Sequence, residues 1–201
     1  MNVRLSDWSA VTSVAPVKEP VTSAEFKSYI RLDGTAEDTY IAGLKSAARL
    51  LVEQLTNRKI ITQTVQVLFD RMPFGAGNID IPFPAVQSVT SVAYRDTAGD
   101  VETETGYTLR AGNHNMFAAL QEPTSGWPST DDEPQAWTFT YVVGYGDDPS
   151  DVPESLRQAI MQIAAGWYEH RESITSLPLN AVPWQAGIVI EQYKMRYNDG
   201  H

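Results

Sequence analysis

The sequence predicts an α+β fold in which a helical core carries an inserted, small antiparallel β subdomain. Two amphipathic patterns predict long helices near residues 37–57 and 153–172, because their apolar residues recur at steps of three and four. Between them, residues 60–146 hold short runs of β-branched and aromatic residues, punctuated by Pro, Gly and Asn. Strands enclosed by helices indicate that the β region is an insertion.

The chain has 201 residues, a length that suits one domain with an inserted subdomain. No apolar run approaches the roughly 18 residues of a membrane helix, so we expect no membrane association. The start, MNVRLSDWSAV, lacks the apolar stretch of a secretory signal, which indicates synthesis in the cytoplasm. We expect five parts: an N-terminal arm (1–20), a first helical part (21–59), the β subdomain (60–146), a second helical part (147–176) and a C-terminal segment (177–201).

The arm shows little periodicity and closes with two prolines, so an extended or mobile segment is expected. Thr22 or Ser23 is predicted to cap a short first helix, with Glu25 in its first turn and Asp33-Gly34 at its end. Thr35 is expected to cap the second helix, near residues 37–57. Its apolar stripe is Tyr40, Ile41, Leu44, Ala48, Leu51 and Leu55, and the polar residues Lys45, Arg49, Glu53 and Gln54 fall mostly off this stripe.

Short runs in the middle of the chain predict the strands of the β subdomain. Each is rich in Val, Thr, Phe, Tyr or Trp and is bounded by turn-forming residues. The segment DTAGD, at Asp96–Asp100, predicts a hairpin turn. The predicted strands lie near residues 62–69, 86–94, 101–109, 116–120 and 137–143.

The third helix is predicted to follow the turn at residues 144–149. Pro153 suits its first position, where a missing N–H costs nothing. Its apolar stripe is formed by Leu156, Ile160, Ile163 and Trp167. In the C-terminal segment, the candidate partner-binding residues are Trp184, Ile188, Val189 and Tyr193; these side chains could equally cover the third helix within the subunit.

The composition argues against several classes of function. A net charge of −10, without a basic run, disfavours nucleic-acid binding, which relies on Lys and Arg. The absence of cysteine excludes disulfides, thiolate metal sites and Cys nucleophiles. His114, His170 and His201 have no metal-ligand spacing, and His170 is expected to be a helix-end residue. We therefore expect no metal and no cofactor.

Other candidate sites also have simpler explanations. Gly75–Gly77 and Gly144–Gly146 lack the spacing of phosphate-binding loops and are expected to form turns. The acidic run Asp131–Glu133 is expected to be a solvated loop, and GxSxG does not occur. The sequence thus predicts that the protein is not an enzyme, with no catalytic residue.

Three segments, in order, resemble head–tail connector (adaptor) proteins of tailed phages. FKSYIRLDGTAEDTYIAGLKSAARLLVEQLTNRKIITQT resembles the opening of that family, PFPAVQSVTSVAYRDTAGD its β insertion, and YVVGYGDDPSDVPESLRQAIMQIAAGWYEHRES its closing helix. The resemblance covers about residues 20–175 and is to the subgroup with a β insertion. Gene transfer agents, which are phage-like particles, carry relatives of these proteins. The chain resembles both the phage connectors and these gene transfer agent relatives.

The resemblance implies a ring, usually of twelve copies, in the virion or phage-like particle at the head–tail interface. Such a ring docks beneath the portal protein, extends the DNA channel and meets a stopper or tail-terminator protein. Twelve copies of a chain with charge −10 would repel DNA and keep it mobile in the channel, with no specific binding. Connector relatives often use a C-terminal extension to reach the portal, which would give the C-terminal candidates their role.

A carbohydrate-binding module of a virion or cell-surface protein is the alternative function. The middle of the chain holds aromatic residues that could stack on sugars if they were exposed on a β scaffold. If they fill a small β core instead, this alternative loses its basis. These aromatic residues are Tyr94, Tyr107, Phe117, Trp127 and Trp137.

Overall fold

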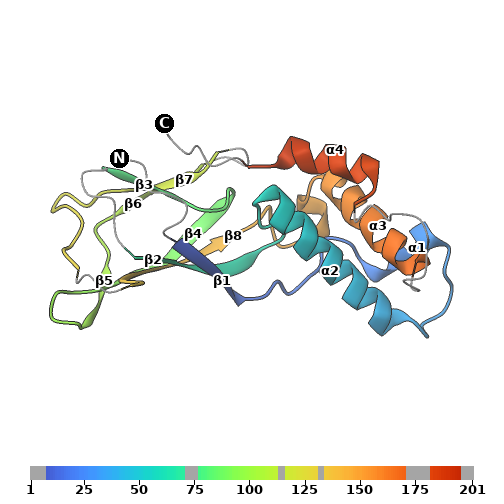
Figure 1. Cartoon of the computed structure of the whole chain (residues 1–201), viewed down its shortest axis with the longest axis horizontal. Coiled ribbons are helices and arrows are strands. Elements are labelled where there is room, and N and C mark those ends of the chain that lie inside the picture. The colour runs from blue at the N-terminus through green and yellow to red at the C-terminus, as the bar shows by residue number, and fades with distance from the viewer. Residues whose placement is uncertain (1–7, 71–76, 113–115, 131–133, 171–181, 196–201) are drawn as a thin grey trace. The chain divides into compact units, whose positions relative to one another are not determined.

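The computed structural model describes residues 8–70, 77–112, 116–130, 134–170 and 182–195. In these ranges the fold is mixed α+β, with four α-helices and two antiparallel sheets, as Figure 1 shows. The α+β class predicted from the sequence is therefore confirmed. The helices are α1 (Ser23–Ile30), α2 (Asp38–Thr56), α3 (Glu154–Glu169) and α4 (Trp184–Tyr193), with a 3₁₀ turn η2 at Pro149–Asp151. The strands are β1 (Trp8–Val14), β2 (Gln63–Phe69), β3 (Asn78–Ile81), β4 (Val86–Arg95), β5 (Val101–Glu104), β6 (Thr108–Arg110), β7 (Ala118–Gln121) and β8 (Trp137–Val143).

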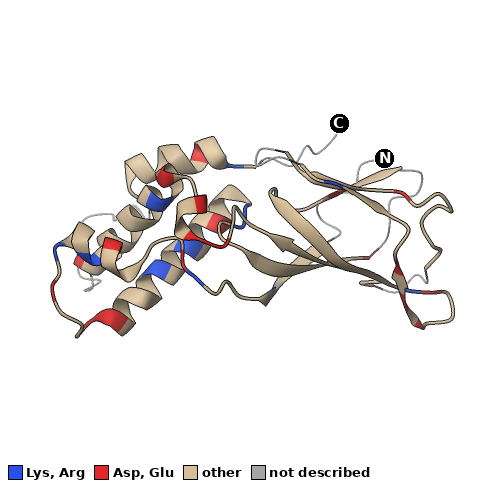
Figure 2. Cartoon of the chain, turned by 180° about the vertical axis from the view of Figure 1, so that it is seen from behind, with Lys and Arg blue, Asp and Glu red and all other residues tan. Residues whose placement is uncertain are grey.

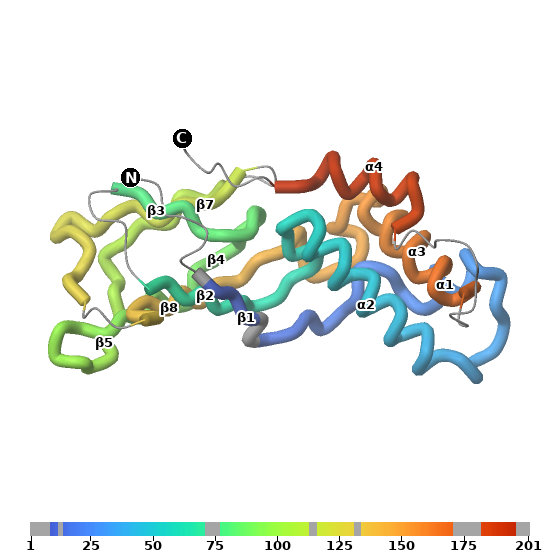
Figure 3. Tube along the Cα trace, in the orientation of Figure 1, coloured from blue at the N-terminus to red at the C-terminus, as the bar shows by residue number. Residues whose placement is uncertain are grey.

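The chain folds into two compact units. The helical unit comprises the described residues from 17 to 61 and from 145 to 194, and the sheet unit comprises those from 8 to 16 and from 62 to 144, with Met195. Within the helical unit, two stretches far apart in the sequence lie side by side, because α3 packs against both α1 and α2 (Figure 3). The helical unit is therefore completed only when the chain returns from the sheet unit.

Helix α1 begins at the predicted cap. The Thr22 hydroxyl oxygen accepts a hydrogen bond from the Glu25 amide at 3.2 Å, and the Glu25 carboxylate accepts one from the Thr22 amide at 2.8 Å. This capping box satisfies two amides that the first helical turn leaves free. The helix ends at Ile30, before the predicted break at Asp33-Gly34, because Arg31 adopts a left-handed conformation (φ 55°) and its amide bonds back to the last turn.

The ends of the long helices differ slightly from the prediction. Thr35 does not cap α2: its carbonyl accepts a hydrogen bond from the Asp38 amide at 3.2 Å in a preceding turn, and Glu37 is the residue at the cap position. The predicted end of α2 is confirmed, because Asn57 closes it in a left-handed conformation. Pro153 lies at the cap position of α3, one residue earlier than predicted. Residues 171 and 172, included in the predicted third helix, lie outside the described residues.

The helical unit has its own hydrophobic core. The predicted stripe of α3 is confirmed, since Leu156, Ile160 and Ile163 are buried and Trp167 packs beside them. Helices α1, α2 and α4 contribute Phe26, Ile41, Ala48, Val52, Ala186 and Ile190 to the same cluster.

Three charged residues of α2 lie inside this unit, although the sequence placed them mostly off the apolar stripe. Lys45, Arg49 and Glu53 are all buried, and Figure 2 shows the charged positions along α2. Arg49 pairs with Glu19 at 2.8 Å and with Glu53 at 3.2 Å, and one Glu53 oxygen accepts a hydrogen bond from the Ile60 amide at 3.0 Å. Glu19, before α1, and Ile60, after α2, are partners from outside the helix, and they make burial of the charges possible.

Lys45 is held in a similar way by the segment before α1. Its ammonium nitrogen donates hydrogen bonds to the Val21 carbonyl and the Ser23 hydroxyl, both at 3.0 Å. Burial lowers the pKa of Lys45, and nearby carboxylates of Glu19, Glu25 and Asp38 oppose that shift. The charged side of α2 therefore binds the chain segment from Glu19 to Ser23.

The larger sheet has the strand order β1-β2-β8-β4-β5, and every pairing in it is antiparallel. Residues Trp8–Val14, expected to belong to an extended arm, form its edge strand β1, paired with β2 from Trp8↔Phe69 to Val14↔Thr64. The predicted turn at Asp96–Asp100 is confirmed: the Asp96 carboxylate accepts hydrogen bonds from the Ala98 and Asp100 amides at 2.8 and 2.9 Å. Strand β8 has the bounds predicted from the sequence, Trp137–Val143.

The smaller sheet, of order β3-β7-β6, corrects two predictions. The run Val101–Leu109 was expected to be one strand, but it forms β5 in the larger sheet and β6 in the smaller one. The interruption falls at Gly106, which lies against the side chains of Glu104 and Pro123. Strand β3 was not predicted, because its four residues Asn-Ile-Asp-Ile form too short a pattern; pairing with β7 defines it.

Candidate partner-binding surface

Helix α4 carries the candidate residues of the C-terminal segment. It begins after Pro183, and its Ala186 and Ile190 side chains are buried against the rest of the helical unit. Its closest packing neighbour is α3, with a smaller contact to α2. One side of the helix is thus fixed in the core, and the opposite side is presented outward.

The four candidates divide between these two sides. Trp184 is 78% exposed and Ile188 is 43% exposed, and the two side chains are four residues apart, on the same side of the helix. Val189 and Tyr193 are partly buried and pack against the hydrophobic core of the helical unit. The sequence left two roles open for these residues, contact with a partner and packing within the subunit. In the structure, two of the side chains face outward and two cover the core.

Tyr193 is held by polar contacts at the end of α4. Its hydroxyl oxygen accepts a hydrogen bond from the Ser155 hydroxyl at 3.0 Å. The guanidinium of Arg58 lies 5.7 Å from the centre of the Tyr193 ring, donates to the Tyr193 carbonyl and reaches the Tyr145 hydroxyl at 3.3 Å. Burial lowers the pKa of Arg58, and Tyr145 and Tyr193 oppose that shift. Arg58 thereby ties α4 to the end of α2.

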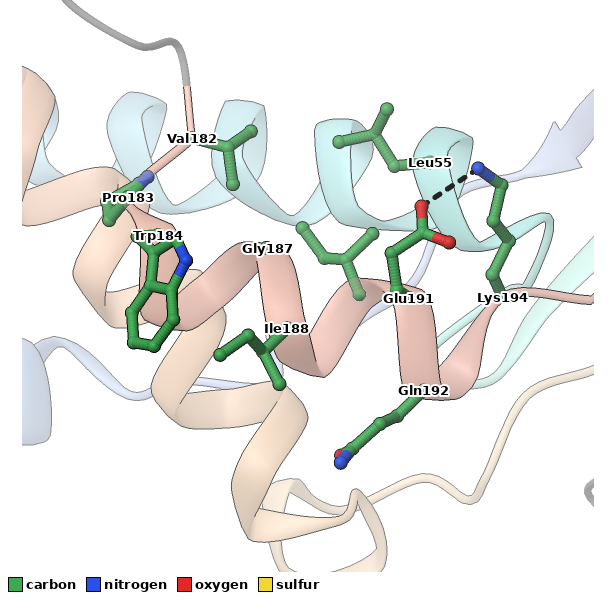
Figure 4. Close-up of a pocket in the computed structure, with 10 residues that line it drawn as sticks. Leu55, Val182, Pro183, Trp184, Gly187, Ile188, Glu191, Gln192 and Lys194 are labelled. Atoms are coloured by element: carbon green, nitrogen blue, oxygen red, sulfur yellow. Dashed lines mark hydrogen bonds and ion pairs between the residues drawn. The ribbon is translucent and has the colours of Figure 1, made fainter.

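An open groove of about 790 Å³ runs along the outer side of α4. Figure 4 shows Trp184 and Ile188 projecting from α4, with Leu55 coming from the neighbouring helix α2. Glu191 and Lys194 form an ion pair at 3.0 Å at the other end. The groove suits an apolar segment of a partner, with a polar contact at one end. It is lined by Leu55, Val182, Pro183, Trp184, Gly187, Ile188, Ile190, Glu191, Gln192 and Lys194.

Glu25 links α1 to α3, and its carboxyl group has a strongly lowered pKa. Burial acts to raise the pKa of the Glu25 carboxyl, but hydrogen bonds from Thr22 and the guanidinium of Arg157 outweigh it and lower the pKa to about 2. Arg157 also donates to the Pro20 carbonyl at 2.9 Å. These contacts connect the chain entering α1 with the first turns of α3.

This shift predicts an acid-sensitive contribution to the stability of the helical unit. The folded-state pKa lies below the usual value of 4.5, so the stabilisation is complete above pH 4.5 and is lost as the pH falls towards 2. A shift of this size corresponds to at most about 3 kcal/mol, and solvent screening of a side chain that is 41% exposed reduces the effect to about 1–2 kcal/mol. We expect Glu25→Gln to lose that part of the pH dependence. Chemical denaturation at a series of pH values would measure it, and identical pH profiles for the two proteins would contradict the assignment.

The aromatic residues of the sheet unit fill its core. Trp137 is fully buried, stacks on Tyr94 with ring centres 5.0 Å apart, and meets Trp127 edge-on at 5.9 Å. Tyr107 packs against the same cluster, and Phe117 is half-buried. A sugar-binding platform needs exposed, parallel rings, so this arrangement does not favour the carbohydrate-binding alternative.

The other candidates from the sequence do not form a reactive site in the described ranges. No group of three or more His, Cys, Asp or Glu residues there could hold a metal ion. His170 is exposed at the end of α3, as expected, whereas His114, His201 and the acidic run Asp131–Glu133 lie outside the described residues. Gly144 has a positive φ of 134° in the turn after β8. None of the helices that the structure describes is long and apolar enough to cross a membrane.

Comparison with solved structures identifies proteins of the same fold. One chain from the neck of an empty gene transfer agent particle, computed with C6 symmetry, has a TM-score of 0.77 and 20% identity, with 96% of this chain and 98% of that chain covered. A chain from the virion of a native gene transfer agent particle has a TM-score of 0.76 and 21% identity, with 95% and 98% covered. A chain from the neck of the native particle, computed with C12 symmetry, has a TM-score of 0.71 and 21% identity, with 96% and 98% covered. No protein-family model matches the chain, and no curated protein does.

The chain therefore shares the fold of chains in the neck and virion of gene transfer agent particles. The particular likeness is to chains of the gene transfer agent neck, over nearly the whole length of both proteins. The resemblance to the gene transfer agent relatives of head–tail connectors, indicated by three segments of the sequence, is thus confirmed at the level of the fold.

Proposed function

We propose that the protein is a structural connector at the head–tail interface of a gene transfer agent or related phage-like particle. The observation that carries this proposal is the likeness of fold over 95–96% of this chain and 98% of the neck and virion chains. Such coverage includes both the helical unit and the sheet unit. In this role the protein docks beneath the portal ring and extends the DNA channel towards the stopper and tail.

A ring of identical subunits fits this role. The similar neck chains come from assemblies computed with C6 and C12 symmetry, and side-to-side contacts between identical subunits close into a ring when the rotation permits. Twelve copies of this chain would carry a large negative charge, since each has a net charge of −10. A channel with such a wall repels the DNA phosphates, so DNA passes without sticking.

The groove along α4 is the proposed portal-binding surface. Trp184 and Ile188 are the large apolar side chains that α4 leaves exposed. Tryptophan is among the side chains that contribute most to the binding energy of protein interfaces. Val189 and Tyr193 support the surface from beneath, because they pack against the core while α4 presents its outer side.

Trp184→Ala is expected to weaken binding to purified portal assemblies by about thirtyfold, because it removes the largest exposed anchor of the groove. Deletion of residues 178–201 should also abolish binding, but it removes the buried Ala186 and Ile190 as well, so the point variant tests the surface more cleanly. Gln185→Ala, at an exposed α4 position that does not line the groove, is the matched control.

Electron microscopy of portal assemblies incubated with the wild-type protein tests the function itself. We expect an added ring of density on the portal, and a titration of binding gives the affinity of each variant. Absence of added density at every salt concentration would contradict the connector role. Added density that is unaffected by Trp184→Ala would leave the connector role intact and show that the groove is not the contact.

A further inference from the structure

The outer face of α2 carries no charge. The helix contains four charged residues. Lys45, Arg49 and Glu53 are buried, and Asp38, whose side chain is 45% exposed, pairs with Lys27 at the start of the helix. By contrast, the exposed positions of α3 are Glu154 and Glu169, as expected for a helix that faces water. The exposed residues of α2, named here the α2 outer face, are Thr39, Tyr40, Ala42, Gly43, Ala47, Leu50 and Gln54.

Packing within the subunit explains only part of this face: Tyr40, which is 41% exposed, lies against Tyr168 with ring centres 6.3 Å apart. Leu50 is 51% exposed. Gly43 weakens the interior of the helix relative to alanine, yet a Cβ atom added there would meet nothing within 4 Å. Gly43 and Ala47 are four residues apart and so lie on one side of the helix, where small side chains allow another backbone to come close.

We propose that the α2 outer face binds a neighbouring copy of this chain in the ring. The inference rests on the proposed connector function, which requires contacts between identical subunits. In a closed ring each contact joins two different surfaces, so the α2 outer face meets another surface of the next subunit.

Charge favours this occupant. Each copy carries a net charge of −10, so two copies repel one another wherever carboxylates face each other. A face without carboxylates allows close approach at the lowest electrostatic cost. The buried positions of Lys45, Arg49 and Glu53 leave the outer side of the helix free of charge.

The α2 outer face is smaller than the area that usually holds two proteins together. Residues 39–54 of an α-helix extend about 24 Å, and a strip roughly 10 Å wide gives about 240 Å². A stable interface between two proteins uses about 800 Å² on each partner. The α2 outer face therefore supplies part of each contact, and we expect pairs of subunits to associate weakly until many contacts act together.

Photo-crosslinking tests the proposal, and the absence of cysteine in the chain makes labelling specific. A benzophenone attached through Ala47→Cys should yield crosslinked dimers and higher multimers at high protein concentration. The same label at Ala98→Cys, an exposed alanine in the turn between β4 and β5, is the matched control and should yield at least about tenfold fewer multimers. Ala47→Glu, tested for unchanged circular dichroism, should reduce ring formation on the portal by at least about tenfold, because it places an unpaired charge in the contact.

The outcomes separate this inference from the proposed function. Rings on the portal that form equally well with Ala47→Glu would overturn the role of α2 and leave the connector function standing. Equal crosslinking from positions 47 and 98 would likewise overturn it. Failure of labelled Ala47→Cys to crosslink, together with failure of the wild-type protein to bind portal, would overturn both.

Discussion

Replacing Glu53 with alanine is expected to lower the free energy of unfolding of the helical unit by about 3–5 kcal/mol. The Glu53 side chain is only 3% exposed and lies 3.2 Å from Arg49 and 3.7 Å from Lys59. Its other oxygen accepts a hydrogen bond from the Ile60 amide at 3.0 Å. The substitution would leave a buried guanidinium without one of its two carboxylates and a buried amide without its acceptor, and both losses are costly.

Urea denaturation followed by circular dichroism measures this effect. Glu191→Ala is the matched control, because Glu191 also lies on a helix and pairs with a lysine, Lys194, but at an exposed site. An exposed ion pair of this kind contributes about 0–1 kcal/mol. Similar losses for the two variants would show that the buried contacts of Glu53 do not stabilise the helical unit.

Trp137→Ala is expected to destabilise the sheet unit by about 3–5 kcal/mol. Trp137 is fully buried and lies among three aromatic rings, with centre distances of 5.0 Å to Tyr94, 5.9 Å to Trp127 and 6.2 Å to Phe139. Removal of the indole leaves a cavity that these rings cannot fill without losing their own contacts.

The same denaturation experiment with Trp184→Ala supplies the comparison. Trp184 is 78% exposed, so its removal should change the stability by no more than about 0.5 kcal/mol while it weakens portal binding. The two tryptophans thus separate folding from partner binding. A large loss of stability for Trp184→Ala, or a small one for Trp137→Ala, would contradict the division of roles proposed for them.

Local sequence patterns predicted the elements whose causes are local. The apolar stripe of α3 and most of the stripe of α2 were predicted from apolar residues that recur at steps of three and four. Tyr40 was wrongly placed on the α2 stripe, since it is 41% exposed and lies on the α2 outer face. The Thr22–Glu25 capping box and the Asp96 turn were predicted because side chains a few residues apart satisfy nearby amides. The class of fold followed from the order of these elements.

The candidate surface was predicted only in part. The residues Trp184 and Ile188 were identified as apolar anchors, but spacing alone could not separate them from Val189 and Tyr193, which pack inward. That separation depends on the direction from which α3 and α2 meet α4. The α2 outer face was not predicted, because an uncharged face becomes visible only once the charged residues are known to be buried.

The sequence by itself determined the α+β class, the two long helices, the principal strands and a likeness to connector proteins, because these depend on periodicity and on ordered segments. Tertiary structure alone decided that Trp8–Val14 is an edge strand, that residues 101–109 serve two sheets, and that Lys45, Arg49 and Glu53 lie inside. The physical reason is the same in each case. Strand pairing and the burial of charge depend on partners distant in the sequence, such as β2 for β1 and Glu19 for Arg49, and no local pattern encodes where those partners will lie.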